Sequence, residues 1–516
     1  MSKRFSQLVM FLLLSSPVLS FMVGIGYVPS PATETNFSLS QDAEFIRGPT
    51  VNMVTNHSAM IFCKTNGPTD VTVRYGLDTD VTDEVHNATL DTEHRVDLTE
   101  LAIDSKYYYQ VVANGTESEI YHFLTAPPDG GHFKMVLLGD NRPGQDVAPQ
   151  QPQNYKDILE MIVGEEPHIV VMSGDFVYHV YDNHETNLNV WRMFSEATDA
   201  LGHYAPIYAC IGNHDTGNGW MHDWYFLQAF EQYDNGSTYF SFDYAGVHFT
   251  IIDTEVEGEE GEIRGEQWDW LVNDLASTKQ PMKFVFGHRP LYPLSHLGSS
   301  MDENKTHRNE LQELFETHNV TLFGCGHDHL YNRMTVNNLI HVISGGAGAP
   351  LYSTLWGGAY NHYVSIDVMK DKLNMTSIDI EGSARDNYVY PYDGPIEIFL
   401  REIADGGQDR NGTIPLILFS EEPEQAYYSW NGEANSTTLS GLPSIAGENT
   451  LDVYAVGENG LWNHEEYTFT TILWPPPDST TTTTTAPPIN PILIFSIVGA
   501  VAVVVVVAVV FKYRSR

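Results

Sequence analysis

"HIVVMSGDFVY", residues 168–178, joins an apolar run to a glycine, an aspartate and a tyrosine. The run Ile169–Met172 is typical of a short strand that is buried on both faces. Gly174 lets the backbone turn sharply as it leaves such a strand. Asp175 and Tyr178 therefore follow a strand end, where Tyr178 is either an ordinary packed aromatic or a metal ligand beside Asp175.

Four more apolar runs within residues 132–385 end in a glycine and a side chain that can bind a metal ion. The five runs end in Gly139-Asp140, Gly174-Asp175, Gly212-Asn213-His214-Asp215, Gly287-His288 and Gly326-His327-Asp328-His329. Helix-like stretches such as 267–275 and 309–318 alternate with the runs, which predicts an α/β layer fold. In such a fold the carboxyl ends of the strands share one edge of the sheet, so we expect these side chains to converge.

The residue types at these strand ends suit a pair of metal ions. Two ions about 3.5–4 Å apart need a bridging oxygen ligand, which a carboxylate can supply and a histidine cannot. In an extended chain His327 and His329 point to the same side, so they can clamp two neighbouring ions. Asn213 adds a neutral oxygen. The sequence therefore predicts a two-metal site.

These motifs resemble those of the calcineurin-like metallophosphoesterases, and among them the purple acid phosphatases. That subgroup carries Gly-Asp-x-Gly, Gly-Asp-x-x-Tyr, Gly-Asn-His-Asp/Glu, Val-x-x-His and Gly-His-x-His. The last four patterns appear here as Gly174-Asp175-Phe-Val-Tyr178, Gly212-Asn213-His214-Asp215, Val285-Phe-Gly-His288 and Gly326-His327-Asp-His329. The resemblance implies a four-layer α/β sandwich with two central sheets over residues 132–385.

The resemblance also implies which residues hold each ion. One ion is expected to bind four side chains: Asp140, Asp175, Tyr178 and His329. The other is expected to bind Asn213, His288, His327 and the bridging Asp175. A phenolate ligand at neutral pH requires a strong Lewis acid, because the pKa of free tyrosine is about 10. The expected pair is therefore Fe(III) with a divalent Zn, Fe or Mn ion.

One motif departs from the family pattern. Gly139-Asp140 is followed by Asn141-Arg142, whereas many metallophosphoesterases place a histidine ligand two residues after the aspartate. Arg142 cannot ligate, because a guanidinium has no free lone pair. The first ion is therefore one ligand short unless Tyr178 supplies it. Arg142 is expected either to clamp a phosphate oxygen or to form a salt bridge in its loop.

The remaining candidates are expected to act on the substrate. The resemblance implies that His214 protonates the leaving oxygen or steadies the charge of the transition state. Asp215 either orients His214 or caps a turn. Asn213 and His296 are candidates for contact with the phosphate, although a loop histidine such as His296 can also lack a role.

The implied reaction is the hydrolysis of a phosphate monoester. Two ions lower the pKa of a bound water from about 15.7 toward 7, and the resulting metal-bound hydroxide attacks phosphorus while His214 assists the leaving alcohol. The Gly-x-Ser-x-Gly elbow of serine hydrolases is not evident near these motifs. Two alternatives stay open: a phosphodiesterase or nucleotidase on the same site, and a catalytically inert surface binding protein.

Two flanking regions alternate apolar and polar residues at the spacing of short strands. Residues 46–127 include Leu101 and the pair Tyr107 and Tyr109, which resemble the fibronectin type III pattern. Residues 393–473 are expected to form a second small β-sandwich. The expected fold class is thus an α/β four-layer metallophosphoesterase sandwich, flanked by two small all-β sandwich domains and followed by a transmembrane helix.

Both ends of the chain predict a location outside the cell. Residues 1–20 place two basic residues before an apolar stretch, which is typical of a secretory signal peptide. A Pro/Thr-rich stalk at 474–491 precedes the uncharged run at 492–511, which is long enough to cross a bilayer. The basic tail at 512–516 is expected to stay in the cytoplasm. We therefore expect a single-pass protein of the cell membrane with an extracellular catalytic domain, although an uncleaved N-terminal anchor or a cleaved C-terminal anchor signal remains possible.

The composition limits the partners. The 26 basic and 67 acidic residues give a net charge of -41, which argues against nucleic acid, because duplex binding needs a basic face. The expected partners are a small phosphate-ester substrate and, through the C-terminal helix, the membrane. Ten Asn-x-Ser/Thr triplets agree with an external, glycosylated surface. Three scattered cysteines predict no disulfide framework.

Overall fold

The computed structural model describes residues 43–473, apart from 147, 234–235, 355 and 404–405. The predicted signal peptide, stalk, transmembrane helix and cytoplasmic tail lie outside these residues. Among the helices that are described, none is both long and apolar enough to cross a bilayer.

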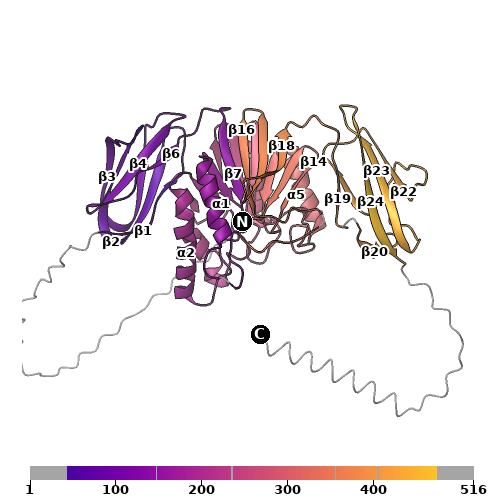
Figure 1. The fold of residues 1–516 in the computed structure, drawn as a ribbon, viewed down its shortest axis with the longest axis horizontal. Helices are drawn as coiled ribbons and strands as arrows, with labels where there is room; N and C mark the ends of the chain where they lie inside the picture. Colours follow the sequence, from indigo (N-terminus) through magenta and orange to yellow (C-terminus); the bar gives the residue numbers. More distant parts are fainter. Residues whose placement is uncertain (1–42, 147, 234–235, 355, 404–405, 474–516) are drawn as a thin grey trace, which may run out of the picture. The chain divides into compact units, whose positions relative to one another are not determined.

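The first described region is an antiparallel six-stranded sheet, drawn in indigo in Figure 1. Its strands are β1 (Phe45–Asn52), β2 (Ala59–Gly76), β3 (Asp83–Leu98), β4 (Lys106–Ala113), β5 (Thr116–Glu117) and β6 (Tyr121–Leu124). Strand β2 pairs with β1 through its first half and with β4 through its second half, while β3 follows it along both. Tyr107, Tyr109 and Val111 alternate along β4 and are buried in one core, as the pattern predicts.

Two six-stranded sheets form the centre of the molecule. The first, in the order β18-β17-β16-β7-β8-β9, contains β7 (Phe133–Leu138), β8 (Ile169–Met172), β9 (Ile207–Ala209), β16 (His362–Met369), β17 (Lys372–Asp379) and β18 (Ala384–Tyr390). The second, in the order β10-β11-β12-β13-β15-β14, contains β10 (Phe240–Tyr244), β11 (Val247–Ile251), β12 (Met282–Phe286), β13 (Leu322–Cys325), β14 (Tyr331–Val336) and β15 (Leu339–Ser344). A single apolar core joins the two sheets, with Phe133 and Val171 from the first and Phe249 and Phe286 from the second.

Helices cover the outer face of each sheet. One apolar core joins the first sheet to α1 (Gln153–Gly164), α2 (His184–Gly202) and α3 (Trp224–Ala229). Another joins the second sheet to α4 (Gly265–Ser277) and α5 (Lys305–Thr317). The four layers of helices, sheet, sheet and helices confirm the predicted metallophosphoesterase fold.

Local sequence explains where the covering helices form. In α1 the buried residues Tyr155, Ile158, Leu159 and Ile162 recur at the three- and four-residue spacing of one helix face. Helix α2 begins after Asn183, whose side chain accepts a hydrogen bond from the backbone N–H of Thr186. The two helical stretches expected from the sequence correspond to α4 and α5.

The five predicted strands are β7, β8, β9, β12 and β13, and they divide between the two sheets. The neighbours β7, β8 and β9 run parallel, as do β12 and β13. The sequence predicted one shared edge, whereas the structure has the carboxyl ends of two facing sheets. Asp140, Asp175 and His327, which follow three of these strands, have positive φ angles of 57°, 62° and 69°. Such angles are uncommon for residues other than glycine and often mark functional sites.

The last described region is a small all-β domain, drawn in yellow in Figure 1. Its strands are β19 (Ile398–Arg401), β20 (Gln408–Arg410), β21 (Leu416–Phe419), β22 (Gln425–Trp430), β23 (Gly447–Val456) and β24 (Trp462–Ile472). Strands β19 and β21 form an antiparallel pair, and the others form a sheet in the order β20-β24-β23-β22. Leu400, Leu451, Val453 and Phe469 belong to the apolar core of this domain. Strand β18 extends the central domain to Tyr390, past the boundary at 385 expected from the sequence.

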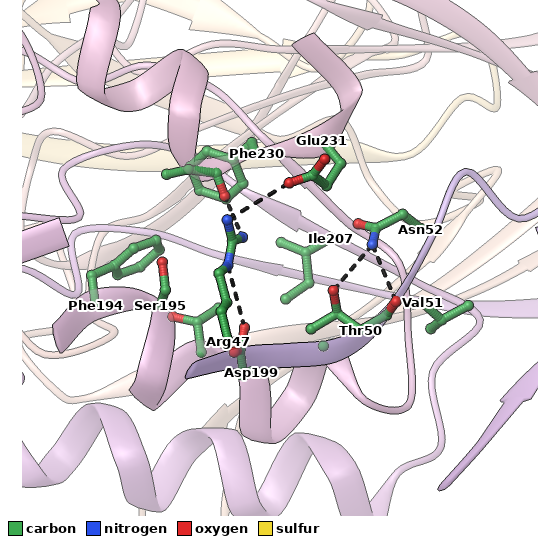
Figure 2. A pocket seen from close by; sticks show the side chains of 13 residues that line it. Arg47, Thr50, Val51, Asn52, Phe194, Ser195, Asp199, Ile207, Phe230 and Glu231 are labelled. Atoms are coloured by element: carbon green, nitrogen blue, oxygen red, sulfur yellow. Dashed lines mark hydrogen bonds and ion pairs between the residues drawn. The ribbon is translucent and has the colours of Figure 1, made fainter. Parts of the chain in front are cut away.

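A polar junction connects β1 to the helices of the central domain, as Figure 2 shows. Arg47 of β1 lies 3.9 Å from the Asp199 carboxylate of α2 and 3.7 Å from that of Glu231. The backbone N–H of Gly48 donates to the same Asp199 carboxylate at 2.7 Å. A cavity of about 30 Å³, the size of one water molecule, lies among these side chains.

Candidate metal centre at the strand ends

Three side chains that follow β7, β8 and β12 form the centre of the site. Ligand atoms of Asp140, Asp175 and His288 all lie within 4.8 Å of one another. All three residues are buried. The glycine-aspartate and glycine-histidine motifs of three strands from two different sheets are therefore brought together, as the sequence predicts.

The hydrogen bonds of His288 define the state of its ring. Its Nδ1 lies 2.8 Å from the backbone carbonyl of Ser173, and because a carbonyl only accepts, Nδ1 carries the proton. The lone pair of Nε2 then faces Asn213 Oδ1 at 3.0 Å and Asp175 Oδ1 at 3.3 Å. His327 Nδ1 is 3.2 Å from the same Nε2. Side-chain atoms that can bind a metal ion thus converge on one point, which is the arrangement of ligands around a cation.

A second set of ligand atoms surrounds Asp140. His329 donates its Nδ1–H to the carbonyl of Pro350 at 2.8 Å, so the lone pair of its Nε2 faces Asp140 Oδ1 at 3.5 Å. The other oxygen of Asp140 accepts the backbone N–H of His327 at 2.9 Å. Within the described residues, Asp140 Oδ1 and His327 Nε2 are buried without a hydrogen-bond partner. Buried polar atoms of this kind call for a partner, which a metal ion supplies.

The charges at the site also indicate a metal centre. Burial, together with the neighbouring Asp175, raises the pKa of Asp140 well above its ordinary value. Burial also raises the pKa of Asp175, but the neighbouring His288 and then His214 outweigh burial and hold that pKa below its ordinary range. Burial lowers the pKa of His288 and that of His329 to about 4. The imidazoles are thus neutral at pH 7, which is the form that binds metals. The residues present fit a metal centre.

Close packing at the strand ends explains two of the motif glycines. A Cβ atom at Gly212 would lie 2.3 Å from the backbone nitrogen of Asp175. A Cβ atom at Gly326 would lie 2.2 Å from Asp140 Oδ2. Any larger residue at either position would push an aspartate away from the centre.

Arg142 lies beside the centre and contacts its predicted bridging ligand. Its Nε donates to Asp175 Oδ2 at 3.2 Å, and the side chain is largely buried. The salt bridge expected as one alternative is therefore present. Within the described part of the chain, the terminal N–H groups of Arg142 make no hydrogen bond, so they can still receive a phosphate oxygen.

The structure places Tyr178 next to His214. The Nδ1–H of His214 donates to the backbone carbonyl of Tyr178, so the Nε2 of His214 is directed to the site, 3.9 Å from Asp175 Oδ2. The two rings are 6.2 Å apart. The Tyr178 hydroxyl makes no hydrogen bond to any described residue, and its ligation of an ion stays a prediction.

Asp215 supports the loop of the bridging aspartate. Its carboxylate accepts the backbone N–H groups of Gly212, Asp175 and Phe176 at 2.8–2.9 Å, and that of Val177 at 3.3 Å. The turn-capping alternative from the sequence is therefore the one observed. Asp215 fixes the position of Asp175 through the backbone.

His296 is held over the site by a residue whose role the sequence did not indicate. Asp328 is buried, and its carboxylate accepts His296 Nδ1 at 2.8 Å together with the backbone N–H of His296 at 3.1 Å. The ring of His296 is 4.2 Å from that of His327. Tyr352, also unexpected, stacks on His329 at 4.2 Å. The alternation of the Gly-His-Asp-His motif showed that Asp328 points away from His327 and His329, but not what it would meet.

Part of the chain matches a known protein family. Residues 133–331 match the family described as calcineurin-like phosphoesterase. The chain therefore contains a calcineurin-like phosphoesterase domain, which is the class that the four layers and the strand-end site define. Residues 42–121 match a domain of unknown function, DUF7800, so the fibronectin likeness of this region stays a prediction.

Purple acid phosphatases are among the homologues of the chain. Acid phosphatase type 7 of Danio rerio is 26% identical over 277 residues, which cover 47% of this chain and 57% of the relative. Purple acid phosphatase 23 of Arabidopsis thaliana is 24% identical, covering 56% of this chain and 67% of the relative. Probable inactive purple acid phosphatase 9 of the same plant is 24% identical, covering 50% and 46%. The chain thus spans roughly half to two thirds of these relatives.

Solved structures share the fold. Purple acid phosphatase PPD1 from yellow lupin (Lupinus luteus) seeds superposes with a TM-score of 0.55 at 21% identity, covering 66% of this chain and 73% of the lupin chain. The structure of PhoD gives a TM-score of 0.52 at 12% identity, covering 66% of this chain and 89% of that chain. At these identities the likeness concerns the fold, and the chemistry has to be argued from the site.

Proposed function

We propose that this protein is a metal-dependent phosphoric ester hydrolase that cleaves phosphate monoesters, as an acid phosphatase of the purple type does. One observation carries the proposal. The lone pair of His288 Nε2 meets oxygens of Asp175 and Asn213 in a buried site, which is the arrangement of ligand atoms that a metal ion takes. The calcineurin-like phosphoesterase domain and the purple acid phosphatase homologues support this assignment.

The proposed centre would hold two ions, with Asp175 as a ligand of both. The first ion would be held by Asp140, Asp175, Tyr178 and His329, and the second by Asp175, Asn213, His288 and His327. The contacts of His288 with Asp175 and Asn213, and that of His329 with Asp140, support this division. When bound, the ions neutralise phosphoryl oxygens and activate a water molecule as the nucleophile. A Tyr178 ligand favours Fe(III) in the first position, with Zn, Fe or Mn in the second.

The side chains around the centre then act on the ester. Arg142 uses its Nε on Asp175, which leaves its terminal N–H groups to bind a phosphate oxygen. His296, fixed at Nδ1 by Asp328, presents Nε2 to the same phosphate. His214, fixed at Nδ1 by the Tyr178 carbonyl, holds a proton at Nε2 for the leaving oxygen. Each ring has one nitrogen anchored and the other directed to the substrate.

The proposed location is the cell membrane, with the catalytic domain outside. The apolar run at 492–511 and the leader-like residues 1–20 support a single-pass topology. The triplets for N-glycosylation also support it. A protease applied to intact cells should digest the catalytic domain and spare a tag placed after residue 516. Protection of the catalytic domain would overturn this topology.

The activity is tested with the purified protein and two chromogenic substrates, 4-nitrophenyl phosphate and bis(4-nitrophenyl) phosphate. We expect turnover of the monoester, and loss of it by at least 10³-fold in Asp175→Asn, because the variant loses the bridging charge. Asp367→Asn is the matched control. Asp367 lies on β16, its carboxylate is partly exposed and contacts His132, and the variant should keep full activity. Turnover of the diester alone would favour a phosphodiesterase. Turnover of neither, with metals bound, would overturn the proposed activity and leave a catalytically inert binding protein.

The metal pair is tested by the visible spectrum. If Tyr178 ligates Fe(III), the protein absorbs in the visible range through the ferric phenolate, and Tyr178→Phe loses this band while it keeps both metals. Tyr181→Phe, three residues further along the same segment, is the control and should keep the band. A colourless protein that binds zinc or manganese, with full activity in Tyr178→Phe, would refute the purple assignment.

A further inference from the structure

The C-terminal domain carries a group of aromatic rings on the open face of its four-stranded sheet. Strands β22, β23 and β24 align Tyr427, Tyr454 and His464 as direct neighbours in one row. Trp462 lies in the adjacent row, opposite Val456. Successive side chains of a strand point to opposite faces, so these rings share one face of the sheet.

The rings lie parallel in two pairs. Tyr427 and Trp462 have centroids 6.0 Å apart and an angle of 10° between their planes. Tyr454 and His464 are 4.2 Å apart at an angle of 9°. Trp462 is 51% exposed, and its indole N–H has no hydrogen-bond partner among the described residues. We call these four residues the ring platform.

The stability of the domain does not explain the ring platform. The core of the domain lies on the opposite face, where Leu451, Val453 and Ala455 of β23 pack with Tyr467 and Phe469 of β24. The platform residues belong to the alternate positions of the same strands. An exposed tryptophan beside two half-exposed tyrosines is costly to keep in water, and such patches usually mark a binding surface.

The groups around the ring platform restrict the chemistry of a ligand. His464 Nε2 lies 2.9 Å from Asp452 Oδ1, and Glu466 is the direct neighbour of Asp452 on the next strand. Acidic groups on a chain of net charge -41 repel nucleic acid, acidic lipid and other polyanions. They accept hydrogen bonds from hydroxyl donors.

From this geometry we infer that the ring platform binds a neutral hexose polysaccharide outside the cell. The flat C–H face of a pyranose carries partial positive charge and stacks on the negative face of an aromatic ring. Its hydroxyl groups donate to Asp452, Glu466 and the amide oxygen of Gln425, which already accepts the hydroxyl of Tyr427 at 3.1 Å. Two parallel ring pairs side by side offer stacking for more than one sugar. The inference is independent of the proposed phosphatase activity.

Affinity electrophoresis of the full-length protein tests the inference. Native gels are cast with one of three neutral polysaccharides (barley β-glucan, yeast α-mannan or galactan), or with the polyanion dextran sulfate. We expect at least one neutral polysaccharide to retard the protein, and dextran sulfate to leave it unretarded. Trp462→Ala combined with Tyr427→Ala should weaken the retardation about tenfold, because both rings that stack on the sugar are lost.

The control variant is Trp220→Ala. Trp220 is 64% exposed but lies in the central domain, far from β24 in sequence, so its loss should leave the retardation unchanged. A conservative Trp462→Phe variant should keep part of the affinity, which separates lost stacking from a misfolded domain. Equal retardation of the double variant and the wild type would overturn the inference. Failure of all three neutral polysaccharides to bind would overturn it as well, whatever the phosphatase assay shows.

Discussion

At the scale of single residues, the metal centre is built from groups that are unfavourable without their ions. Asp140 and Asp175 adopt left-handed backbone angles and place two buried carboxylates within 4.8 Å of His288. Strained backbone and facing charges cost free energy in the folded state. The site thus lowers the stability of the metal-free protein while it allows metal binding. Single substitutions can measure both effects.

Asp140→Asn should raise the stability of the metal-free protein and lower its metal binding. The amide oxygen still accepts the backbone N–H of His327, while the charge facing Asp175 is removed. We expect the metal-free variant to be about 1–3 kcal/mol more stable than the metal-free wild type, and to bind less metal. Urea unfolding in a chelator and metal analysis by mass spectrometry measure the two effects. The control is Asp302→Asn, another buried aspartate, which accepts the backbone N–H of Gly298 and should not stabilise. A less stable metal-free Asp140→Asn would contradict the argument.

Asp328 should act as a positioning residue for His296. Asp328→Asn removes a carboxylate that holds both the ring and the backbone of His296. We expect kcat/KM for an aryl phosphate to fall about 10–100-fold, with metal content retained. In a double-mutant cycle with His296→Gln the two losses should not add, because both act through the same ring. Additive losses would mean that Asp328 supports the fold and not His296. Asp302→Asn, in the loop that follows His296, is again the control.

At the scale of elements, the sequence predicts strands and helices that a local pattern of apolar residues marks. It does not predict which distant strands pair with one another. The strands β7, β8, β9, β12 and β13 were predictable because each is a short apolar run with a glycine at its end. The antiparallel pairing of β7 with β16 joins segments more than 200 residues apart, and no local pattern encodes it. Tyr352 stacks on His329 from the loop between β15 and β16, and no local pattern of the sequence indicates this contact.

A buried ion pair between β11 and α4 makes the stability of the second sheet depend on pH. His248 donates to Asp274 at 3.0 Å and to Asp243 at 2.7 Å. Burial lowers the pKa of His248, but these two carboxylates more than offset burial and raise it overall. Burial raises the pKa of Asp274, but its partners, first His248, lower it overall.

The raised pKa of His248 sets the sign of the effect. Its contribution is complete below the unfolded value of about 6.5 and is lost as the pH rises through the folded pKa. We expect His248→Gln to cost on the order of 2 kcal/mol at pH 5.5 and less at pH 9, as measured by urea unfolding at both pH values. His464→Gln, which removes an exposed pairing with Asp452, is the control and should cost less than His248→Gln at pH 5.5. An equal cost of His248→Gln at pH 5.5 and pH 9 would contradict the assignment.

At the scale of the whole molecule, the site depends on two sheets that are held in register by one shared core. Asp140, Asp175 and Asn213 come from the first sheet, and His288 and His327 come from the second. The motifs could be read one by one, but their distances depend on how Phe133 and Phe249 pack between the sheets. The domain that precedes this core is attached through the junction of β1 and α2, where charged groups are taken out of water.

Arg47 should couple the unfolding of the first domain to that of the central domain. Its guanidinium faces Asp199 and Glu231, whose side chains are only 12% and 4% exposed. Burial raises the pKa of Asp199, which Arg47 opposes, so Arg47→Met leaves a buried carboxylate without its arginine. We expect a loss of about 3–5 kcal/mol, seen in calorimetry as an earlier, separate transition of the first domain. The control is Arg192→Met. Arg192 lies on α2, the helix of Asp199, and forms an exposed ion pair with Glu196, so its loss should cost at most about 0.5 kcal/mol. If both variants unfold alike in a single transition, the junction does not hold the two domains together.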